Sequence, residues 1–223
     1  MKRTAELVII LLGCAVVFSQ VARDHRAPAA TASPVAVATR SPLNYYKCAH
    51  EFSDPQSESL LERAYSNTKD PKCLELFDQL LAREPRSPIG YYHKGDALYD
   101  QDRYPEAIAA LDKAIALEPG FANALYLRAC CHDVMDVPRG WEAGLKDIEL
   151  ALSLDEDAEN HSLRSSLLLQ LKRTEEALLE SDLAVKIDAT RDVLEQRANV
   201  YESLGRTKDA ERDRKRAEKL PED

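Results

Sequence analysis

The chain has 223 residues, 44% hydrophobic and 31% charged, a composition typical of a globular protein and unlike that of a disordered one. Few glycines and phenylalanines among many alanines and leucines favour an all-helical fold. The formal net charge is −9, and because residues 1–42 carry five basic and two acidic side chains, the rest stands at −12. That part would repel a polyanion at long range, so we expect no nucleic-acid partner.

Residues 1–22 have the features of a signal peptide or a membrane anchor. A lysine and an arginine follow Met1, and LVIILLGCAVVF is twelve apolar residues, the length of a signal-peptide core and short of the roughly 20 that span a bilayer. Three alternatives stay open: cleavage after Ser19, an uncleaved anchor extended to Ala22, and lipidation of Cys14, because LLGC resembles the bacterial lipoprotein signal. All three place the bulk of the chain outside the cytoplasm, secreted or tethered on the periplasmic or other extracytoplasmic side. Membrane contact would be through this segment only.

Residues 23–55 are predicted to be a flexible linker. Their central part, APAATASPVAVATRSP, consists of alanine, proline and threonine without apolar periodicity. Such a segment buries too little surface to offset its chain entropy, so it would act as an extended spacer.

Helical patterns begin at about residue 56. Helices are predicted over Ser57–Tyr65 and Pro71–Glu84. Next, YYHKGDALYD and YPEAIAALDKAIAL each carry apolar residues at three- and four-residue spacing, with DQDR between them as a turn. Pro105 is tolerated only in the first turn of a helix, so a helix boundary lies there. Two short antiparallel helices result, and neither alone buries its apolar stripe.

This helix pair recurs along the chain. Small residues repeat in the first helix at Gly95, Ala129, Ser165 and Ala198. They repeat in the second helix at Ala107, Gly144, Ala177 and Ala210, and again at Ala114, Ala151, Ala184 and Ala217. The first-helix spacings are 34, 36 and 33 residues. We assign the longer unit to about three extra residues in the turn DVMDVPRGW.

The units resemble the tetratricopeptide repeat family, whose period is 34 residues. The signature positions of that family hold Tyr91, Gly95, Leu98, Tyr104, Ala107, Ala114 and Pro119. The resemblance implies an all-α, right-handed α-solenoid of antiparallel helix pairs, with a degenerate pair at 56–87 and repeats at 88–121, 122–157, 158–190 and 191–223. In such a fold the small residues allow close helix approach. Larger residues would fill the seams between helices: Leu111, Leu117, Leu127, Ile148, Leu154, Leu168, Ile187 and Tyr201.

The last helix, KDAERDRKRAEKL, has a different character. Residues 206–223 hold seven basic and six acidic side chains. One interpretation is a docking face for a charged partner; we favour a solvated cap that closes the array.

The concave face of the array is the candidate binding site. In the family this face is lined by fixed positions of each first helix, and we predict a partner-binding groove formed by Tyr92, Asp96, Tyr99, Asp100, Asn123, Tyr126, Asp133, Glu195 and Asn199. The remaining positions of the face hold Cys130, Glu159, Ser162, Ser166, Gln170, Asp192 and Glu202. Tyrosines offer rigid amphipathic area and carboxylates offer charge, which suits a peptide or helix with basic residues. The alternative is that the tyrosines cover helix seams and the acids are ordinary surface.

One activity within the family is disfavoured. Its co-chaperones grip an acidic carboxyl-terminal tail with lysine, arginine and asparagine on the concave face. This chain has Tyr92 and Asp96 where lysine and asparagine would be needed.

Catalysis has no support in the sequence. Phosphate-binding glycine loops, HExxH helices and GxSxG elbows are absent. Cys130, Cys131 and His132 are consecutive, and helical neighbours point about 100° apart, so they cannot converge on one metal ion. We therefore predict no catalytic residues, no metal and no cofactor.

Cysteine use is compatible with export. If Cys14 is lipidated or removed, four cysteines remain, with three possible pairings. A bond between Cys130 and Cys131 within one helix is implausible, and we predict a disulfide between Cys48 and Cys73.

Together these observations predict a non-catalytic scaffold that holds proteins of a cell-envelope assembly through its groove. The alternative is an accessory or regulatory subunit of a separate enzyme, and a third interpretation is a purely structural tether.

Overall fold

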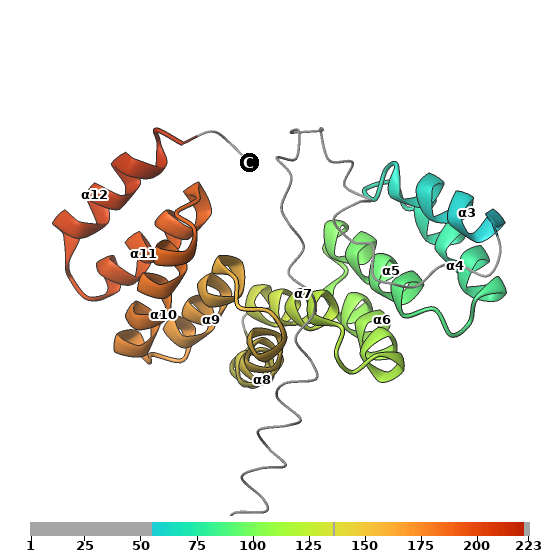
Figure 1. Ribbon diagram of the computed structural model, residues 1–223, viewed down its shortest axis with the longest axis horizontal. Coiled ribbons are helices and arrows are strands. Elements are labelled where there is room, and N and C mark those ends of the chain that lie inside the picture. Colours follow the sequence, from blue (N-terminus) through green and yellow to red (C-terminus); the bar gives the residue numbers. More distant parts are fainter. Residues whose placement is uncertain (1–54, 136, 221–223) are drawn as a thin grey trace, which may run out of the picture. The chain divides into compact units, whose positions relative to one another are not determined.

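The computed structural model describes residues 55–135 and 137–220, which form ten α-helices joined by short connections (Figure 1). The predictions on the export segment, the linker, Cys14 and Cys48 fall outside these residues. Within the described ranges, no helix combines the length and the apolar character needed to cross a bilayer.

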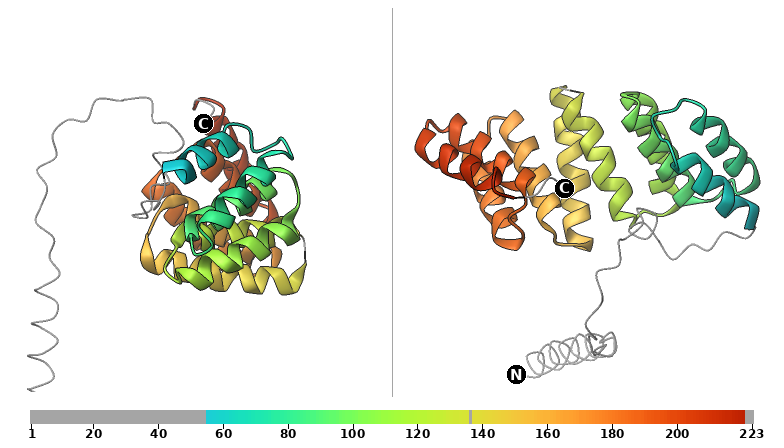
Figure 2. Two further views of the ribbon diagram at one scale, coloured as in Figure 1. Left: turned by 90° about the vertical axis from the view of Figure 1, so that its right-hand side faces the viewer. Right: turned by 90° about the horizontal axis from the view of Figure 1, so that it is seen from above.

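The helices follow one another as antiparallel pairs. Their bounds are α3 Pro55–Tyr65, α4 Cys73–Arg83, α5 Pro88–Asp100, α6 Tyr104–Leu117, α7 Ala122–Val134, α8 Pro138–Leu154, α9 Ala158–Gln170, α10 Thr174–Ile187, α11 Arg191–Ser203 and α12 Thr207–Ala217. Each helix packs on the next, and the pairs stack in chain order (Figure 2). The predicted fold class, an all-α solenoid of helix pairs, is confirmed.

The first helices of the pairs form an inner row. Helices α3, α5, α7, α9 and α11 pack on one another in succession, more closely than the second helices do. A stack whose first helices approach each other must curve towards them, and Figure 1 shows these helices on the inner side of the arc. The exposed side of this row is therefore the concave face.

Small residues set the helix spacing as predicted. A Cβ atom added to Gly95 would lie 2.8 Å from Leu111 Cγ, and one added to Gly144 would lie 3.2 Å from the Leu167 methyl groups. Alanines at the other recurring positions have no exposed surface, among them Ala107, Ala129, Ala177, Ala198 and Ala210. Larger side chains at these places would push the helices apart.

The prediction that large residues fill the helix seams is wrong for two of them. Leu154 is 49% exposed and Ile187 is 46% exposed, because both lie in the last turn of a second helix, on its outward side. On α10, Leu179 and Leu183 continue this exposed apolar strip. Other predicted seam residues are buried, namely Leu111, Leu127, Ile148, Leu168 and Tyr201.

The longer second repeat has its extra residues in a helix, which corrects the predicted longer turn. Helix α8 has 17 residues whereas α6 and α10 have 14 each, and its amino end is the part that is extended. The added turn lies against α7, since a Cβ on Gly140 would be 3.3 Å from His132 Nδ1. In the other three repeats the connection contains one residue with positive φ: Asp102, Lys172 or Gly205.

A repeated cation ties each first helix to the second helices on both sides of it. The bridges join Arg128 to Asp112 and Asp147, Arg164 to Glu149 and Glu180, and Arg197 to Asp182 and Asp213. In each case one carboxylate lies on the preceding pair and the other on the same pair. We call this set the arginine ladder.

The ladder is strongest where its carboxylate is buried. Asp213 is 2% exposed, and Arg197 binds it through two hydrogen bonds of 2.7 and 3.0 Å. At the same position of the first repeat, Lys94 pairs with Asp78, whose side chain is 64% exposed. Ion pairs with buried, bidentate geometry bind more strongly than exposed ones.

Candidate functional site

Helix α5 supplies much of the candidate site, and its position is fixed at its start. The Ser87 hydroxyl accepts a hydrogen bond from the Gly90 backbone N–H at 3.1 Å, and Pro88 occupies the first turn. A Cβ on Gly90 would lie 2.6 Å from Leu80, so α5 approaches α4 as closely as a glycine allows. These contacts present Asp96, Tyr99 and Asp100 on the inner row.

Three carboxylates of α5 and α7 are held by hydroxyl groups. Tyr65 Oη donates to Asp96 Oδ2 at 3.1 Å, Thr68 donates to Asp100, and Ser166 Oγ donates to Asp133 Oδ2 at 2.9 Å. Among the described residues, none of these three carboxylates forms an ion pair with a lysine or an arginine. They thus differ from the carboxylates of the arginine ladder. We call Asp96, Asp100 and Asp133 the acidic triad.

The surroundings make ionisation of Asp96 and of Asp133 costly. Burial raises the pKa of Asp96 to about 6, the Asp100 charge adds to this effect, and the Tyr65 hydrogen bond opposes it. Burial also raises the pKa of Asp133, against the Ser166 hydrogen bond. Asp133 Oδ1 is buried and accepts no hydrogen bond from the described residues. A bound cation would compensate these charges.

The three predicted tyrosines have different surroundings. Tyr99 is partly exposed and contacts Tyr104 edge-on, with ring centroids 5.4 Å apart. Burial raises its pKa, and the Asp133 charge adds a smaller contribution, so the ring lies near Asp133. Tyr126 is partly buried against the core of the second and third repeats.

Tyr92 lies in a seam between helices. It is only 4% exposed, and its ring centroid lies 5.1 Å from that of Phe121 and 5.0 Å from that of His93. Little of its surface is left for a partner to contact.

The other half of the inner row is small and polar. Glu195 and Asn199 of α11 are exposed. In the first half, the predicted groove residue Asn123 of α7 is partly buried. Asn199 Oδ1 accepts a hydrogen bond from Arg214 at 3.2 Å, and Arg214 also pairs with Glu202. Arg214 of the same repeat therefore binds Asn199 and neutralises Glu202.

The cysteines of the described residues are thiols. Cys73 is buried and free; it donates to the Thr68 carbonyl at 3.4 Å and accepts from Gln101 at 3.5 Å. The predicted bond to Cys48 stays a prediction, because Cys48 lies outside the described residues. Burial raises the pKa of Cys131 to about 12, as expected for a packed thiol. No cluster of metal-ligating side chains is present in the part of the chain that the structure describes.

Sequence reasoning missed the donors Tyr65 and Thr68 and the arginine ladder. Tyr65 ends α3 and Thr68 lies in the loop between α3 and α4, in the pair that matches the repeat signature least, so periodicity gave no signal for them. The ladder did have a signal, because Lys94, Arg128, Arg164 and Arg197 recur at the first-helix spacings of 34, 36 and 33.

Comparison with known proteins relates this fold to one family. The tetratricopeptide repeat family model matches residues 74–130. Hsp70-Hsp90 organizing protein of Triticum aestivum is 28% identical over 145 residues, which is 65% of this chain and 23% of that protein. Hsp70-Hsp90 organizing protein 1 of Glycine max is 32% identical over 111 residues, 50% of this chain and 18% of that protein. The chain thus spans less than a quarter of the length of these relatives.

Solved structures share the architecture. MamA from Desulfovibrio magneticus RS-1 superposes with a TM-score of 0.65 at 16% identity, covering 76% of this chain and 97% of that one. A thermophilic tetratricopeptide repeat protein of Thermus thermophilus gives a TM-score of 0.63 at 18% identity, covering 72% of this chain and 89% of that one. At this identity the likeness concerns the fold alone. The family model matched over residues 74–130, the stacked helix pairs and these neighbours together show that the chain has the fold of a tetratricopeptide repeat array.

Proposed function

We propose that the chain is a protein-interaction scaffold whose inner face at α5 and α7 binds a peptide or helix carrying basic residues. The observation that carries the proposal is the acidic triad, three carboxylates held by hydroxyl donors and by no cation of the described residues. A lysine or arginine from a partner would neutralise the charges of Asp96 and Asp133, which burial makes costly. Tyr99, beside the triad, offers an aromatic surface for the stem of such a side chain.

An acidic tail is the wrong ligand for this face. Hsp70-Hsp90 organizing proteins are relatives by sequence. The family resemblance implies that its co-chaperones grip acidic tails with basic residues. Here Asp96 is a carboxylate and Tyr92 is buried, so an incoming carboxylate would meet like charge. The proposed partner is therefore basic and differs from a co-chaperone ligand.

Neutralising the triad with near-isosteric side chains tests the proposal. The variant Asp96→Asn/Asp100→Asn/Asp133→Asn keeps an acceptor for each hydroxyl but removes the charges. The full-length chain serves as bait for affinity capture and as the receptor for a labelled lysine-rich peptide in fluorescence anisotropy. We expect the variant to lose captured partners and to bind the peptide at least about tenfold more weakly, as for a few lost charge pairs of partly buried groups.

A matched control separates the site from net charge. Glu159→Gln/Asp192→Asn/Glu195→Gln removes the same number of carboxylates from α9 and α11, where all three are exposed. We expect peptide binding within about twofold of the wild type, since distant exposed charges are screened. Equal losses in both variants, or unchanged capture by the triad variant, would contradict the groove. Capture of an enzyme whose activity changes on binding would support the accessory-subunit alternative.

We also propose that residues 1–22 export the chain and tether it to a membrane. The support is the sequence alone, a positive start followed by twelve apolar residues. Cell fractionation and radioactive palmitate labelling of the wild type and of Cys14→Ser test this. A soluble cytoplasmic protein would exclude export, and label that persists in Cys14→Ser would exclude lipidation at Cys14.

A further inference from the structure

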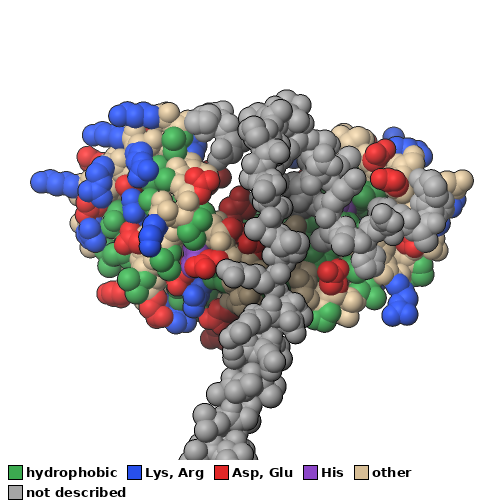
Figure 3. All heavy atoms as spheres, in the orientation of Figure 1, with side chains coloured by type: hydrophobic (Ala, Val, Ile, Leu, Met, Phe, Trp, Pro, Cys, Tyr) green, Lys and Arg blue, Asp and Glu red, His purple; other side chains and the backbone are tan. Residues whose placement is uncertain are grey.

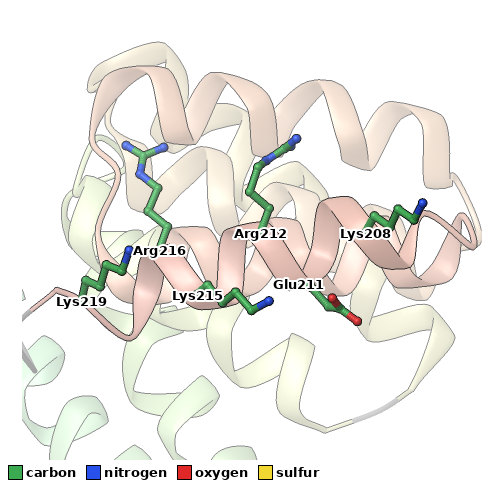
Figure 4. Close-up of a pocket in the computed structure, with 6 residues that line it drawn as sticks. All are labelled: Lys208, Glu211, Arg212, Lys215, Arg216 and Lys219. Carbon is green, nitrogen blue, oxygen red and sulfur yellow. The ribbon is translucent and has the colours of Figure 1, made fainter.

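Helix α12 carries a basic stripe on its open side. Lys208, Arg212, Lys215, Arg216 and Lys219 line an open depression of about 410 Å³, with Glu211 as its acidic member (Figure 4). Lysine and arginine side chains gather on this end of the molecule (Figure 3). Arg212 pairs with Asp209 at 2.9 Å; the other four cations are exposed and form no ion pair with the residues that the structure describes. We call these five cations the α12 stripe.

Comparison with the arginine ladder shows that the stripe includes the position at which a second helix contacts the next first helix. The second helix of each preceding pair carries a carboxylate five residues after its small position, and that carboxylate receives the cation of the next first helix. The residues are Asp78, Asp112, Glu149 and Asp182. In α12 the same position, five after Ala210, holds Lys215. The charge at the junction is therefore reversed on the last described second helix.

The apolar contacts of the junction are changed as well. One residue after the small position, Leu178 of α10 packs in the core, whereas α12 has Glu211 there. Eight residues after it, Val185 packs against α11, whereas α12 has Glu218. A further repeat with a cation on its first helix would not fit this side, but an acidic helix would.

We propose that the side of α12 that bears the stripe is a second docking surface, which binds an acidic helix of a partner protein where a next first helix would lie. The reversed ladder position supplies the charge complementarity, and the four cations without ion pairs supply attraction along the stripe. This surface is separate from the inner groove and selects the opposite charge. The two surfaces together would let one scaffold hold two partners without competition.

The shape and charge of the surroundings favour a narrow helix over an extended polyanion. Residues 43–223 carry a net charge of −12, so a bilayer or a nucleic acid that extended beyond the stripe would meet repulsion. A single helix is about 10 Å wide and fits along one helix of the array. Helices of the array already contact one another in this way at every internal junction.

A designed helix tests the proposal on the full-length chain. The probe is a labelled alanine-based peptide of about four helical turns with glutamates along one face, and its control has glutamines instead. We expect the glutamate peptide to bind the wild type more tightly than the glutamine peptide does, and we expect this binding to weaken as the salt concentration rises. Its binding to Lys215→Glu/Lys219→Glu should be about tenfold weaker than its binding to the wild type. The variant Lys215→Gln/Lys219→Gln should give an intermediate loss.

Two controls make the test specific. Lys146→Glu/Lys186→Glu changes the net charge equally on exposed residues of α8 and α10, and we expect binding within about twofold of the wild type. The triad variant Asp96→Asn/Asp100→Asn/Asp133→Asn should bind the glutamate peptide unchanged, so failure of the groove and failure of the stripe are distinguishable. Equal losses in both charge-reversal variants would overturn the proposal. So would stripe-dependent binding to phosphatidylglycerol vesicles without peptide binding, which would assign the surface to a membrane.

Discussion

The first two repeats and the last two have the same backbone plan but different inner surfaces. At one recurring position the first helices hold Tyr92 and Tyr126, and then Ser162 and Glu195. At another they hold Asp96 and Cys130, and then Ser166 and Asn199. The difference teaches that the small buried residues fix the solenoid, whereas the residues of the inner row vary between repeats, and we propose that the exposed ones carry the binding chemistry.

The two halves differ in how their charges are balanced too. In α5 and α7 the inner carboxylates rely on hydroxyl groups, and the pKa of Asp96 is raised to about 6. In α11 the inner polar groups are bound by Arg214 of the same repeat. We therefore expect the proposed partner to gain most by supplying a cation to the first half.

Removing a cation of the arginine ladder should give the largest loss of stability, and we expect a large loss only in the second half. Arg197→Ala would leave Asp213, 2% exposed, as a buried charge without its main partner, at a cost of about 3 kcal/mol in the free energy of unfolding. Lys94→Ala at the equivalent place should cost less than about 1 kcal/mol, because Asp78 is exposed. Urea denaturation followed by circular dichroism measures both. Midpoints of both variants equal to that of the wild type would show that the ladder adds nothing to stability, and equal losses would contradict the predicted difference between the halves.

Removing an aromatic ring should affect binding more in the first half. We expect Tyr99→Ala to weaken the binding of the lysine-rich peptide by about 2 kcal/mol, or roughly thirtyfold, as for an aromatic anchor at an interface. Glu202→Ala, at the same position of the last repeat, should change affinity by less than about threefold. Fluorescence anisotropy with both variants compares the halves directly. An equal loss would mean that the peptide contacts the whole inner row.

The stability of the folded chain should depend on pH through the ionisation of Asp96. Because its pKa is raised to about 6 from 3.8, the folded chain binds more protons than the unfolded chain between these values. This group therefore lowers stability as pH rises from about 4 to 6. Asp96→Asn should be more stable than the wild type at pH 7, by on the order of 1 kcal/mol after allowance for solvent screening, and equal to it below pH ~4. Denaturation midpoints of the wild type and of Asp96→Asn, measured across this pH range, test the direction of the change. A difference between the two proteins that does not vary with pH would refute the prediction. Glu195→Gln serves as the control, for which we expect no pH-dependent difference from the wild type.

The smallest effect should come from the connections, which the halves share. Lys172 has φ of 61°, a conformation that glycine adopts without strain, so Lys172→Gly should stabilise by about 0.5–1 kcal/mol. Gly205 has φ of 70° with open space around it, so Gly205→Lys should cost a similar amount. Thermal denaturation of both variants measures this pair. Changes of the same sign would argue against a common loop geometry.

The solenoid was predictable because its determinants are local and periodic. Gly95 and Ala107 must be small for the helices to touch, and their equivalents recur at a fixed spacing. The surroundings of the candidate site were not predictable, because Tyr65 and Thr68 come from a pair that lacks the repeat pattern. Nor did spacing alone show that the extra residues of the second repeat lengthen α8, since a longer turn explains the same period.

The arginine ladder also makes the repeats exchangeable parts. Each second helix with an acid at the shared position accepts any first helix with the matching cation, so deletion of residues 158–190 would bring Arg197 against Glu149 with the charges still matched. Duplication of an internal repeat would preserve the match in the same way. Addition of such a repeat after α12 would instead set a cation against Lys215. The array is thus built to change length from within, and its charge pattern opposes growth at the α12 end.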